Sequence, residues 1–115
     1  MKTENIIRVK TFDFALSIIE LYKIMKAQKE YVLSKQLLRS GTSIGANVEE
    51  ATAAISKKDF TAKMSISSKE ARETRYWLLL LEKSKLVDIN LKRPLYDIEE
   101  IINILTAIVK TSQSR

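Results

Sequence analysis

Both glycines of the chain lie in one short stretch, RSGTSIGANVEE (residues 39–50), together with three hydroxyl side chains. A glycine-rich loop can hold a phosphate group with its backbone N–H groups. The Walker-type loop, however, has four residues between its glycines and a Lys-Ser or Lys-Thr pair after the second. Here three residues separate Gly41 from Gly45, and Ala46-Asn47 follows. The spacing therefore argues against a phosphate-binding loop.

A second pattern that could contact phosphate is a group of basic side chains in residues 57–87, which carry eight basic and four acidic residues. On a helix with about 100° per residue, six of these cations and one tyrosine fall within an arc of about 120°. They are Lys57, Lys58, Lys69, Arg72, Arg75, Tyr76 and Lys83. Cations on a nucleic-acid backbone release counterions, and an aromatic ring can stack on a base. The arc suggests nucleic-acid binding, and a solvated charged helix face would have the same composition.

Catalytic chemistry has little support in the composition, because the chain contains neither histidine nor cysteine. This excludes Ser-His-Asp and Cys-His arrangements and zinc sites that use those ligands. A di-metal bundle needs Glu-x-x-His pairs, so the glutamates are interpreted as solvated or ion-paired. Glu70 lies at the margin of a core-facing stripe, where Arg39, Lys63 or Asn47 could pair with it. We therefore predict no enzyme activity, no catalytic residue, no metal and no cofactor.

Four amphipathic segments must position these side chains. Apolar residues recur with helical three- and four-residue spacing over residues 5–27, 31–55, 57–84 and 91–111. In the second segment the spacing passes from Leu33 to Ile55 through both glycines without a change of phase, which predicts one continuous helix. An interior glycine costs about 1 kcal/mol relative to alanine. We therefore expect Gly41 and Gly45 to permit close packing of a neighbouring group, with Trp77 as the predicted partner.

The connections between these segments are short, which favours antiparallel neighbours. Ser56, with Asp59 three residues later, is a predicted cap of the third helix, and Asn90 of the fourth. We predict a single all-α domain over residues 1–115, an up-down-up-down antiparallel four-helix bundle with left-handed crossing. No apolar run is long enough for a membrane span, the first residues do not resemble a signal peptide, and disulfides are excluded. The expected location is the cytoplasm, without membrane binding.

The first helix carries a second apolar stripe of Phe12, Leu16 and Ile19, nearly opposite its core stripe. The corresponding face of a monomer should be polar. The apolar arc of the last helix is also unusually wide, through Ile101, Ile104 and Ile108. Both features predict burial against another subunit and hence a homo-oligomer.

The segments LSKQLLRSGTSIGANVEEA (residues 33–51) and SKKDFTAKMSISSKEARETRYWLLLL (residues 56–81) resemble the four-helix-bundle proteins of the 23S rRNA intervening-sequence family. The family pattern is approximately LS-QLLRSGTSIGANI-EA, then S--DF--K--IA-KEA-ET-YWL-LL, and similarity is looser in the first and last helices. Departures are Ser67-Ser68, where the family often has alanine, and the basic Arg72 and Arg75. The resemblance implies a closed bundle that assembles into a homopentamer. Such a bundle is similar to the accessory protein of diversity-generating retroelements. That accessory protein is basic and associates with nucleic acid and a reverse transcriptase.

These observations predict a non-enzymatic oligomeric bundle that binds the RNA or DNA backbone through the basic face of the third helix. The alternative is a protein–protein interaction scaffold without nucleic-acid binding. In that case the positive charge, a formal +6 for the whole chain, would serve solubility or the steering of a protein partner.

Overall fold

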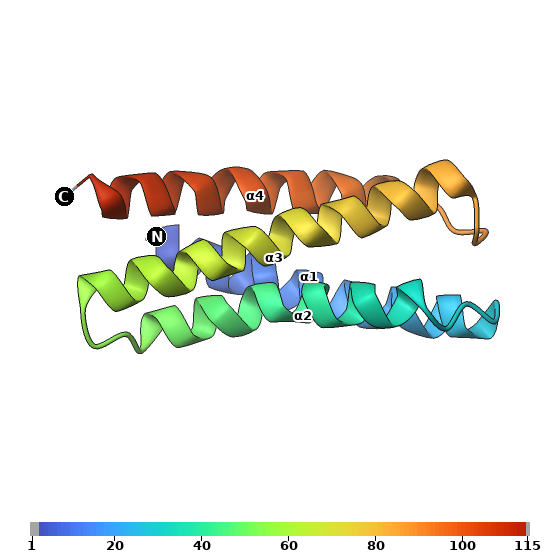
Figure 1. Cartoon of the computed structure of the whole chain (residues 1–115), viewed down its shortest axis with the longest axis horizontal. Helices are drawn as coiled ribbons and strands as arrows, with labels where there is room; N and C mark the ends of the chain where they lie inside the picture. Colours follow the sequence, from blue (N-terminus) through green and yellow to red (C-terminus); the bar gives the residue numbers. More distant parts are fainter. Residues whose placement is uncertain (1–2, 115) are drawn as a thin grey trace.

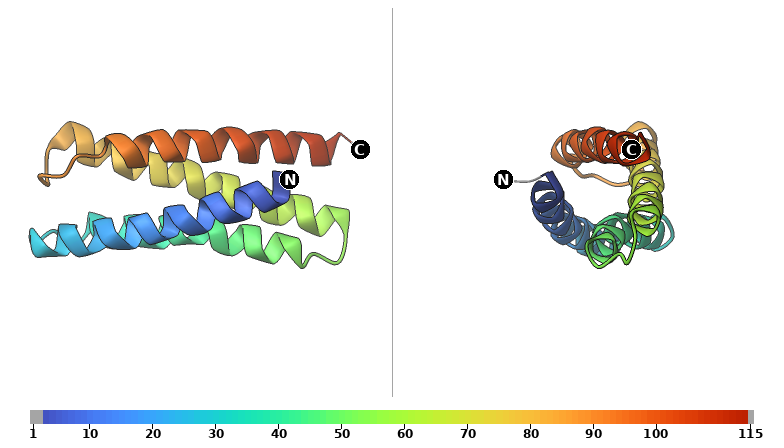
Figure 2. Two further views of the ribbon diagram at one scale, coloured as in Figure 1. Left: turned by 180° about the vertical axis from the view of Figure 1, so that it is seen from behind. Right: turned by 90° about the vertical axis from the view of Figure 1, so that its left-hand side faces the viewer.

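Four helices account for most of the chain in the computed structural model, which describes residues 3–114 except for the Glu4 side chain. They are α1 (Thr3–Ala27), α2 (Leu33–Thr52), α3 (Lys57–Ser84) and α4 (Lys92–Gln113). Each helix packs against the next, and α4 packs back on α1 in the least extensive of the four contacts. Figures 1 and 2 show successive helices running in opposite directions around a shared core. The all-α four-helix bundle is confirmed, while its left-handed crossing stays a prediction.

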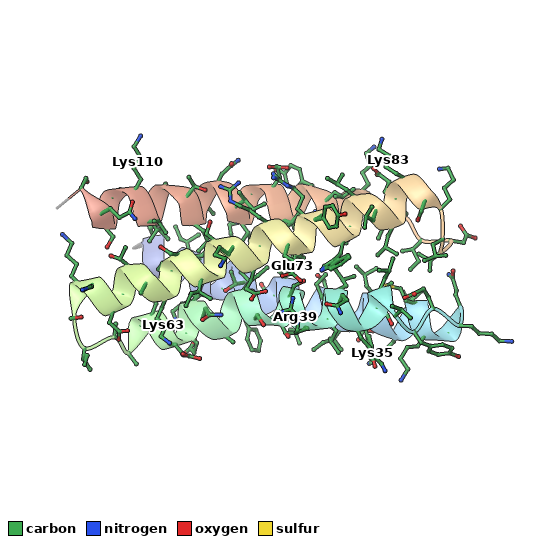
Figure 3. The ribbon with its side chains drawn as sticks, in the orientation of Figure 1. Lys35, Arg39, Lys63, Glu73, Lys83 and Lys110 are labelled. Atoms are coloured by element: carbon green, nitrogen blue, oxygen red, sulfur yellow. The ribbon has the colours of Figure 1, made fainter. Side chains whose placement is uncertain are left out.

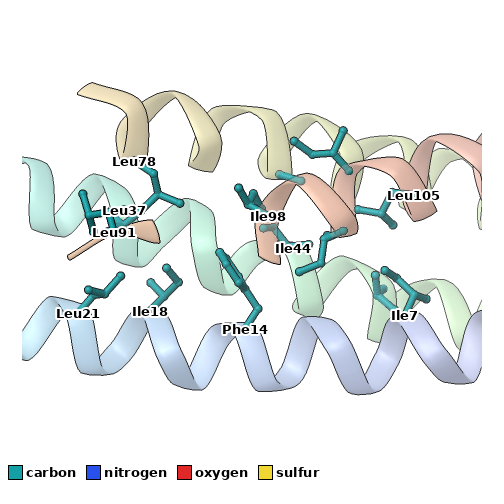
Figure 4. Close-up of a cluster of buried hydrophobic side chains, with 14 of the residues drawn as sticks. Ile7, Phe14, Ile18, Leu21, Leu37, Ile44, Leu78, Leu91, Ile98 and Leu105 are labelled. Carbon is teal, nitrogen blue, oxygen red and sulfur yellow. The ribbon is translucent and has the colours of Figure 1, made fainter. Parts of the chain in front are cut away.

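The core is built from one apolar stripe per helix. The core stripe predicted for the first segment consists of Ile7, Phe14, Ile18, Leu21 and Met25, and all five side chains are buried in α1. Figure 4 shows Phe14 and Ile18 of this stripe facing Ile44 of α2 and Ile98 of α4 across the bundle interior. Because apolar burial stabilises by roughly 25 cal/mol per Å², this shared core is what aligns the four helices.

The beginning of α2 differs from the sequence prediction by two residues. Lys29 adopts a left-handed conformation (φ 66°) that ends α1. The carboxylate of Glu30 then accepts hydrogen bonds from the backbone N–H groups of Val32, Leu33 and Ser34 at 3.1, 3.1 and 2.7 Å. A carboxylate in this position satisfies orphan N–H groups and complements the positive end of the helix dipole. The helix therefore begins at Leu33 and not at Tyr31.

The predicted end of α2 at Ile55 is wrong, because the helix stops at Thr52 and Ile55 is 95% exposed. The cause is the cap of the following helix. Ser56 has an extended backbone, and its hydroxyl accepts the Asp59 N–H at 3.0 Å. Since an N-cap residue must have non-helical dihedrals, the chain leaves α2 before Ser56, and Ile55 lies in the turn. The predicted Asn90 cap of α4 is wrong, because the helix is preceded by Leu91, which makes no side-chain capping bond, and Asn90 accepts the Lys92 N–H at 3.0 Å from the turn before it.

The two glycines of α2 lie against α1. A Cβ placed on Gly41 would lie 2.9 Å from Cγ2 of Ile18, and one placed on Gly45 would lie 3.3 Å from the backbone oxygen of Thr11. The expected Trp77 partner is therefore wrong, since the nearest atoms belong to α1. Trp77 instead donates its Nε1–H to Glu73 at 3.0 Å.

The seam between α2 and α3 contains buried hydroxyl groups. Thr74 donates to the Ser40 hydroxyl at 2.9 Å, and Ser67 donates to the backbone oxygen of Ile44 at 2.8 Å. All three hydroxyl residues are fully buried. Because a buried hydroxyl is costly without a partner, these bonds fix how α2 and α3 face each other. They also give a structural role to Ser67, one of the two serines that depart from the family pattern.

A charged cluster closes the outer side of the same seam (Figure 3). Arg39 of α2 pairs with Glu70 at 3.3 Å and also with Glu73, both on α3. Arg39 was one of the three partners expected for Glu70. The other two are engaged elsewhere: Lys63 pairs with Glu50 at 2.9 Å, and Asn47 donates to a backbone oxygen in its own helix. Glu70 is therefore a structural ion-pair residue.

Replacing Glu73 with glutamine should make stability less sensitive to acid. Burial alone would raise the pKa of the Glu73 carboxyl, but hydrogen bonds from Arg39 and Trp77 outweigh burial and hold that pKa below its ordinary value. A carboxyl with a lowered folded-state pKa contributes stability above its unfolded pKa of about 4.3, and this stability is lost as pH falls through the folded value. Denaturant titrations at neutral pH and at about pH 3 should show a smaller acid-induced loss for Glu73→Gln than for wild type.

The matched control for this experiment is Glu82→Gln, which alters an exposed carboxylate of the same helix. It should leave the pH dependence of unfolding close to that of the wild type. An equal acid-induced loss in Glu73→Gln and wild type would contradict the assignment to Glu73.

Candidate nucleic-acid interface

The two arginines predicted on the basic face of α3 are both directed toward α4. Arg75 pairs with Glu99 through Nη1 at 2.8 Å, so its charge is neutralised within the bundle. Arg72 donates from Nη2 to the hydroxyl of Thr106 at 3.1 Å and has no acidic partner among residues 3–114. Of the two, Arg72 keeps an uncompensated positive charge for an external ligand.

The lysines of the predicted face are exposed to solvent. Lys58, Lys69 and Lys83 form no ion pair with the described part of the chain, and Lys57 begins the helix beside Lys58. Figure 3 shows Lys83 on the same edge of the molecule as Lys110 of α4, both pointing away from the bundle. The predicted basic residues therefore lie on the surface in two separate places. Lys69 and Lys83 lie on the outer side of α3, and the two arginines lie at the seam with α4.

That seam contains a groove formed by two adjoining cavities of about 280 and 580 Å³. They share Ser65 and Gln113, so they form one depression between the first half of α3 and the last half of α4. We refer to it as the α3/α4 groove. Its cations are Lys57, Lys58, Arg72 and Lys110. Its other polar residues are Thr61, Ser65, Ser68, Thr106, Ser112 and Gln113.

The charged side chains found to line the α3/α4 groove are all basic. None of the described residues that line it is acidic. Most nearby carboxylates are already paired on other seams: Glu50 with Lys63, Glu99 with Arg75 and Glu100 with Lys10. Positive charge with no acidic side chain among the described lining residues raises the potential for anions over the groove. Hydroxyl and amide donors of the kind lining it are those that contact phosphate and sugar oxygens in nucleic-acid complexes.

Sequence reasoning missed the half of this groove that α4 contributes. Lys110 and Thr106 lie more than 30 positions from Arg72 in the chain, and a wheel drawn for α3 alone contains no information about them. Thr61 and Ser112 share a hydrogen bond that joins the two walls. Of the predicted residues, Lys69, Tyr76 and Lys83 do not line the groove, and Arg75 belongs to an ion pair.

The apolar stripe predicted on α1 lies on the molecular surface. Phe12 is 65% exposed and Leu16 50%, with Ile19 at 36%. Beside Phe12 a cavity of about 860 Å³ lies between α1 and α2, with Gly45 and Ala46 among its lining residues. On α4, by contrast, Ile101 and Ile108 are buried and Ile104 packs against the core. The wide arc of α4 is therefore explained by the bundle's own interior and gives no support to a contact with another subunit.

Within residues 3–114, no helix is both long and apolar enough to cross a membrane. Among curated proteins, no relative of the chain is found. A solved structure of a protein of unknown function, from the S23 ribosomal protein family of Bacteroides thetaiotaomicron, is 44% identical to this chain. The two structures superpose with a TM-score of 0.89, and the match covers 95% of this chain and 99% of the Bacteroides protein.

Neither that protein's description nor the family's specifies an enzymatic activity. The family model for the 23S rRNA-intervening sequence protein matches residues 3–107, nearly the whole bundle and most of the α3/α4 groove. The chain belongs to the 23S rRNA-intervening sequence protein family.

Proposed function

We propose that this protein is a non-enzymatic, oligomeric four-helix bundle that binds the backbone of RNA or DNA through the α3/α4 groove. The observation that carries the proposal is the groove lining: basic side chains from two helices, among them Lys58, Arg72 and Lys110, hydroxyl and amide donors between them, and no acidic side chain among the described lining residues. Phosphate oxygens are anionic acceptors, so this lining matches them in both charge and hydrogen bonding.

Binding of this kind has a characteristic dependence on salt and little dependence on sequence. Each cation that neutralises a phosphate releases condensed counterions, so the affinity falls as salt rises. Contacts to phosphate carry no base information. We therefore expect similar affinities for unrelated sequences and a steep loss of affinity from low to physiological salt.

Removing one lysine from each wall of the groove should weaken binding to all sequences alike. In Lys58→Gln/Lys110→Gln the slope of log affinity against log salt should become shallower by about 1 per lysine, with affinity at low salt reduced about tenfold or more. Fluorescence anisotropy with mixed single- and double-stranded probes measures both quantities.

The matched control, Lys29→Gln/Lys35→Gln, removes the same charge from exposed lysines at the α1–α2 connection and on α2. Figure 3 shows Lys35 pointing away from the bundle on the edge opposite Lys110. This control should change affinity less than twofold. Wild-type protein that binds no probe at low salt, or binds equally at low and high salt, would contradict the proposed function.

Oligomerisation is the second part of the proposal. The exposed stripe of Phe12, Leu16 and Ile19 is typical of a surface covered by another subunit. The family resemblance implies five subunits. Light scattering on the wild-type protein at micromolar concentration should give a mass several times 13.2 kDa.

An interaction scaffold without nucleic-acid binding is the alternative, and the same exposed stripe favours it. In that case a protein partner would cover α1, and the positive charge would act in long-range steering. Purification that recovers one stoichiometric protein and no nucleic acid would favour the scaffold. Absorbance at 260 and 280 nm on the purified protein separates the two cases.

A further inference from the structure

We propose that the nucleic acid held by the α3/α4 groove is single-stranded, and that its unpaired bases stack on Tyr76. This inference rests on the proposed function and adds to it the strandedness of the ligand and a base-contacting residue. It follows from the packing of α3 between α2 and α4 and from the setting of the Tyr76 ring.

The packing of α3 between its neighbours keeps it from entering the major groove of a duplex. Adjacent packed helices have axes about 8–10 Å apart, and the groove is the depression between two of them. A protein helix that reads B-DNA must instead project into a major groove about 12 Å wide. Here α3 is flanked by α2 on one side and by α4 on the other. A duplex would therefore meet the groove through its phosphates alone, whereas a single strand could also present its unpaired bases to an exposed ring.

Tyr76 is placed to receive a base from such a strand. It lies one turn beyond Arg72 on the outer side of α3, displaced from it by about 40° around the helix axis. The side chain is 56% exposed. Its ring packs edge-on against Trp77, with centroids 5.3 Å apart and planes at 66°. Trp77 is in turn anchored on Glu73. The tyrosine ring is thus supported by its neighbour, while more than half of the side chain remains open to solvent.

An exposed aromatic ring distinguishes single strands from duplexes. Bases inside a duplex are covered on both faces by their neighbours, but unpaired bases can be splayed out and stacked on protein aromatics. From Lys58 to Tyr76 the helix rises about 27 Å. A strand whose phosphates follow the groove from Lys58 to Arg72 would deliver its next base to Tyr76.

The test compares strands of equal length on the wild-type protein and on Tyr76 variants by fluorescence anisotropy at low salt. The probes are twenty-nucleotide oligo(dT) and oligo(U) and a twenty-base-pair mixed-sequence duplex. We expect tighter binding to a single strand, of either sugar, than to the duplex. Tyr76→Ala should weaken single-strand binding about fivefold to a hundredfold, the range for loss of one base–aromatic stack, and leave duplex binding unchanged. Tyr76→Phe keeps the ring and should bind within twofold of wild type.

Tyr31→Ala is the matched control, because Tyr31 is similarly exposed at 52% but lies in the α1–α2 connection. It should have wild-type affinity. Duplex binding as tight as single-strand binding, or unchanged single-strand affinity in Tyr76→Ala, would overturn the inference while leaving backbone binding intact. Absence of binding to all three probes would instead remove the proposed function itself.

Discussion

Replacing Gly41 with leucine should lower the free energy of unfolding by about 3 kcal/mol or more. The first carbon added at this position would lie 2.9 Å from Cγ2, 3.0 Å from Cγ1 and 3.3 Å from Cβ of Ile18. Ile18 is fully buried, and its β-branched side chain has essentially one preferred rotamer in a helix. A rotation therefore cannot relieve the contact, and α1 and α2 must separate. Separation opens the core that both helices share.

A graded series isolates this packing effect from helix propensity. Gly41→Ala gains about 1 kcal/mol of propensity but still overpacks the interface, so we expect a net loss of about 1 kcal/mol. Gly45→Ala gains the same propensity, and its Cβ would lie 3.3–3.4 Å from Thr11 atoms, which is tight but not overlapping. We expect it within about 0.5 kcal/mol of wild type.

Urea denaturation followed by far-UV circular dichroism measures all three variants. Each must be measured at one protein concentration, because the proposed assembly would contribute to apparent stability. A Gly41→Leu variant as stable as the wild type would show that α1 and α2 are not as close together as in the structure.

Replacing Phe12 and Leu16 with aspartate should convert the proposed oligomer into a monomer. Burying one large apolar side chain is worth about 1.5–3 kcal/mol. Losing two from each subunit contact therefore weakens association about a thousandfold, before the cost of burying two carboxylates. Both side chains are half or more exposed, so the bundle itself should keep its helical signal and its cooperative unfolding.

Size-exclusion chromatography with light scattering reports the mass, and circular dichroism reports the fold. The matched control is Val32→Asp/Ile55→Asp, which places the same charges at the apolar residues of two connections that are 71% and 95% exposed. It should assemble like wild type. A Phe12→Asp/Leu16→Asp variant with the wild-type mass would show that α1 is not the contact surface.

The helices were predictable because their signal is local. Three- and four-residue apolar spacing identified every helix, and the stripe of α1 is buried from Ile7 to Met25. The ends of α2 were less predictable, since side chains outside the helix decide them. Glu30 caps its start from the preceding turn, and Ser56, which caps the next helix, ends its run before Ile55. Competition between caps changes an end by two or three residues without affecting the core.

Only the α3 wall of the α3/α4 groove could be predicted from the sequence. Periodicity placed Lys58 and Arg72 on the same side of α3, because both belong to one helix. It also grouped Arg75 with them, although Glu99 of α4 neutralises this arginine. Which cation keeps its charge for a ligand depends on the carboxylates that face it from the neighbouring helix. That information is absent from any single segment.

The number, the approximate extent and the buried faces of the helices could be predicted from the amino-acid sequence, since they follow from propensity and from hydrophobic spacing along one segment. Which helix each glycine approaches, and which α4 residues complete the basic groove, depends on how the helices pack against one another. Helical periodicity specifies the direction in which a side chain points, but not what lies there. The groove exists because α3 and α4, joined by a short connection, pack side by side on one core and bring Arg72 next to Thr106 and Lys58 next to the end of α4.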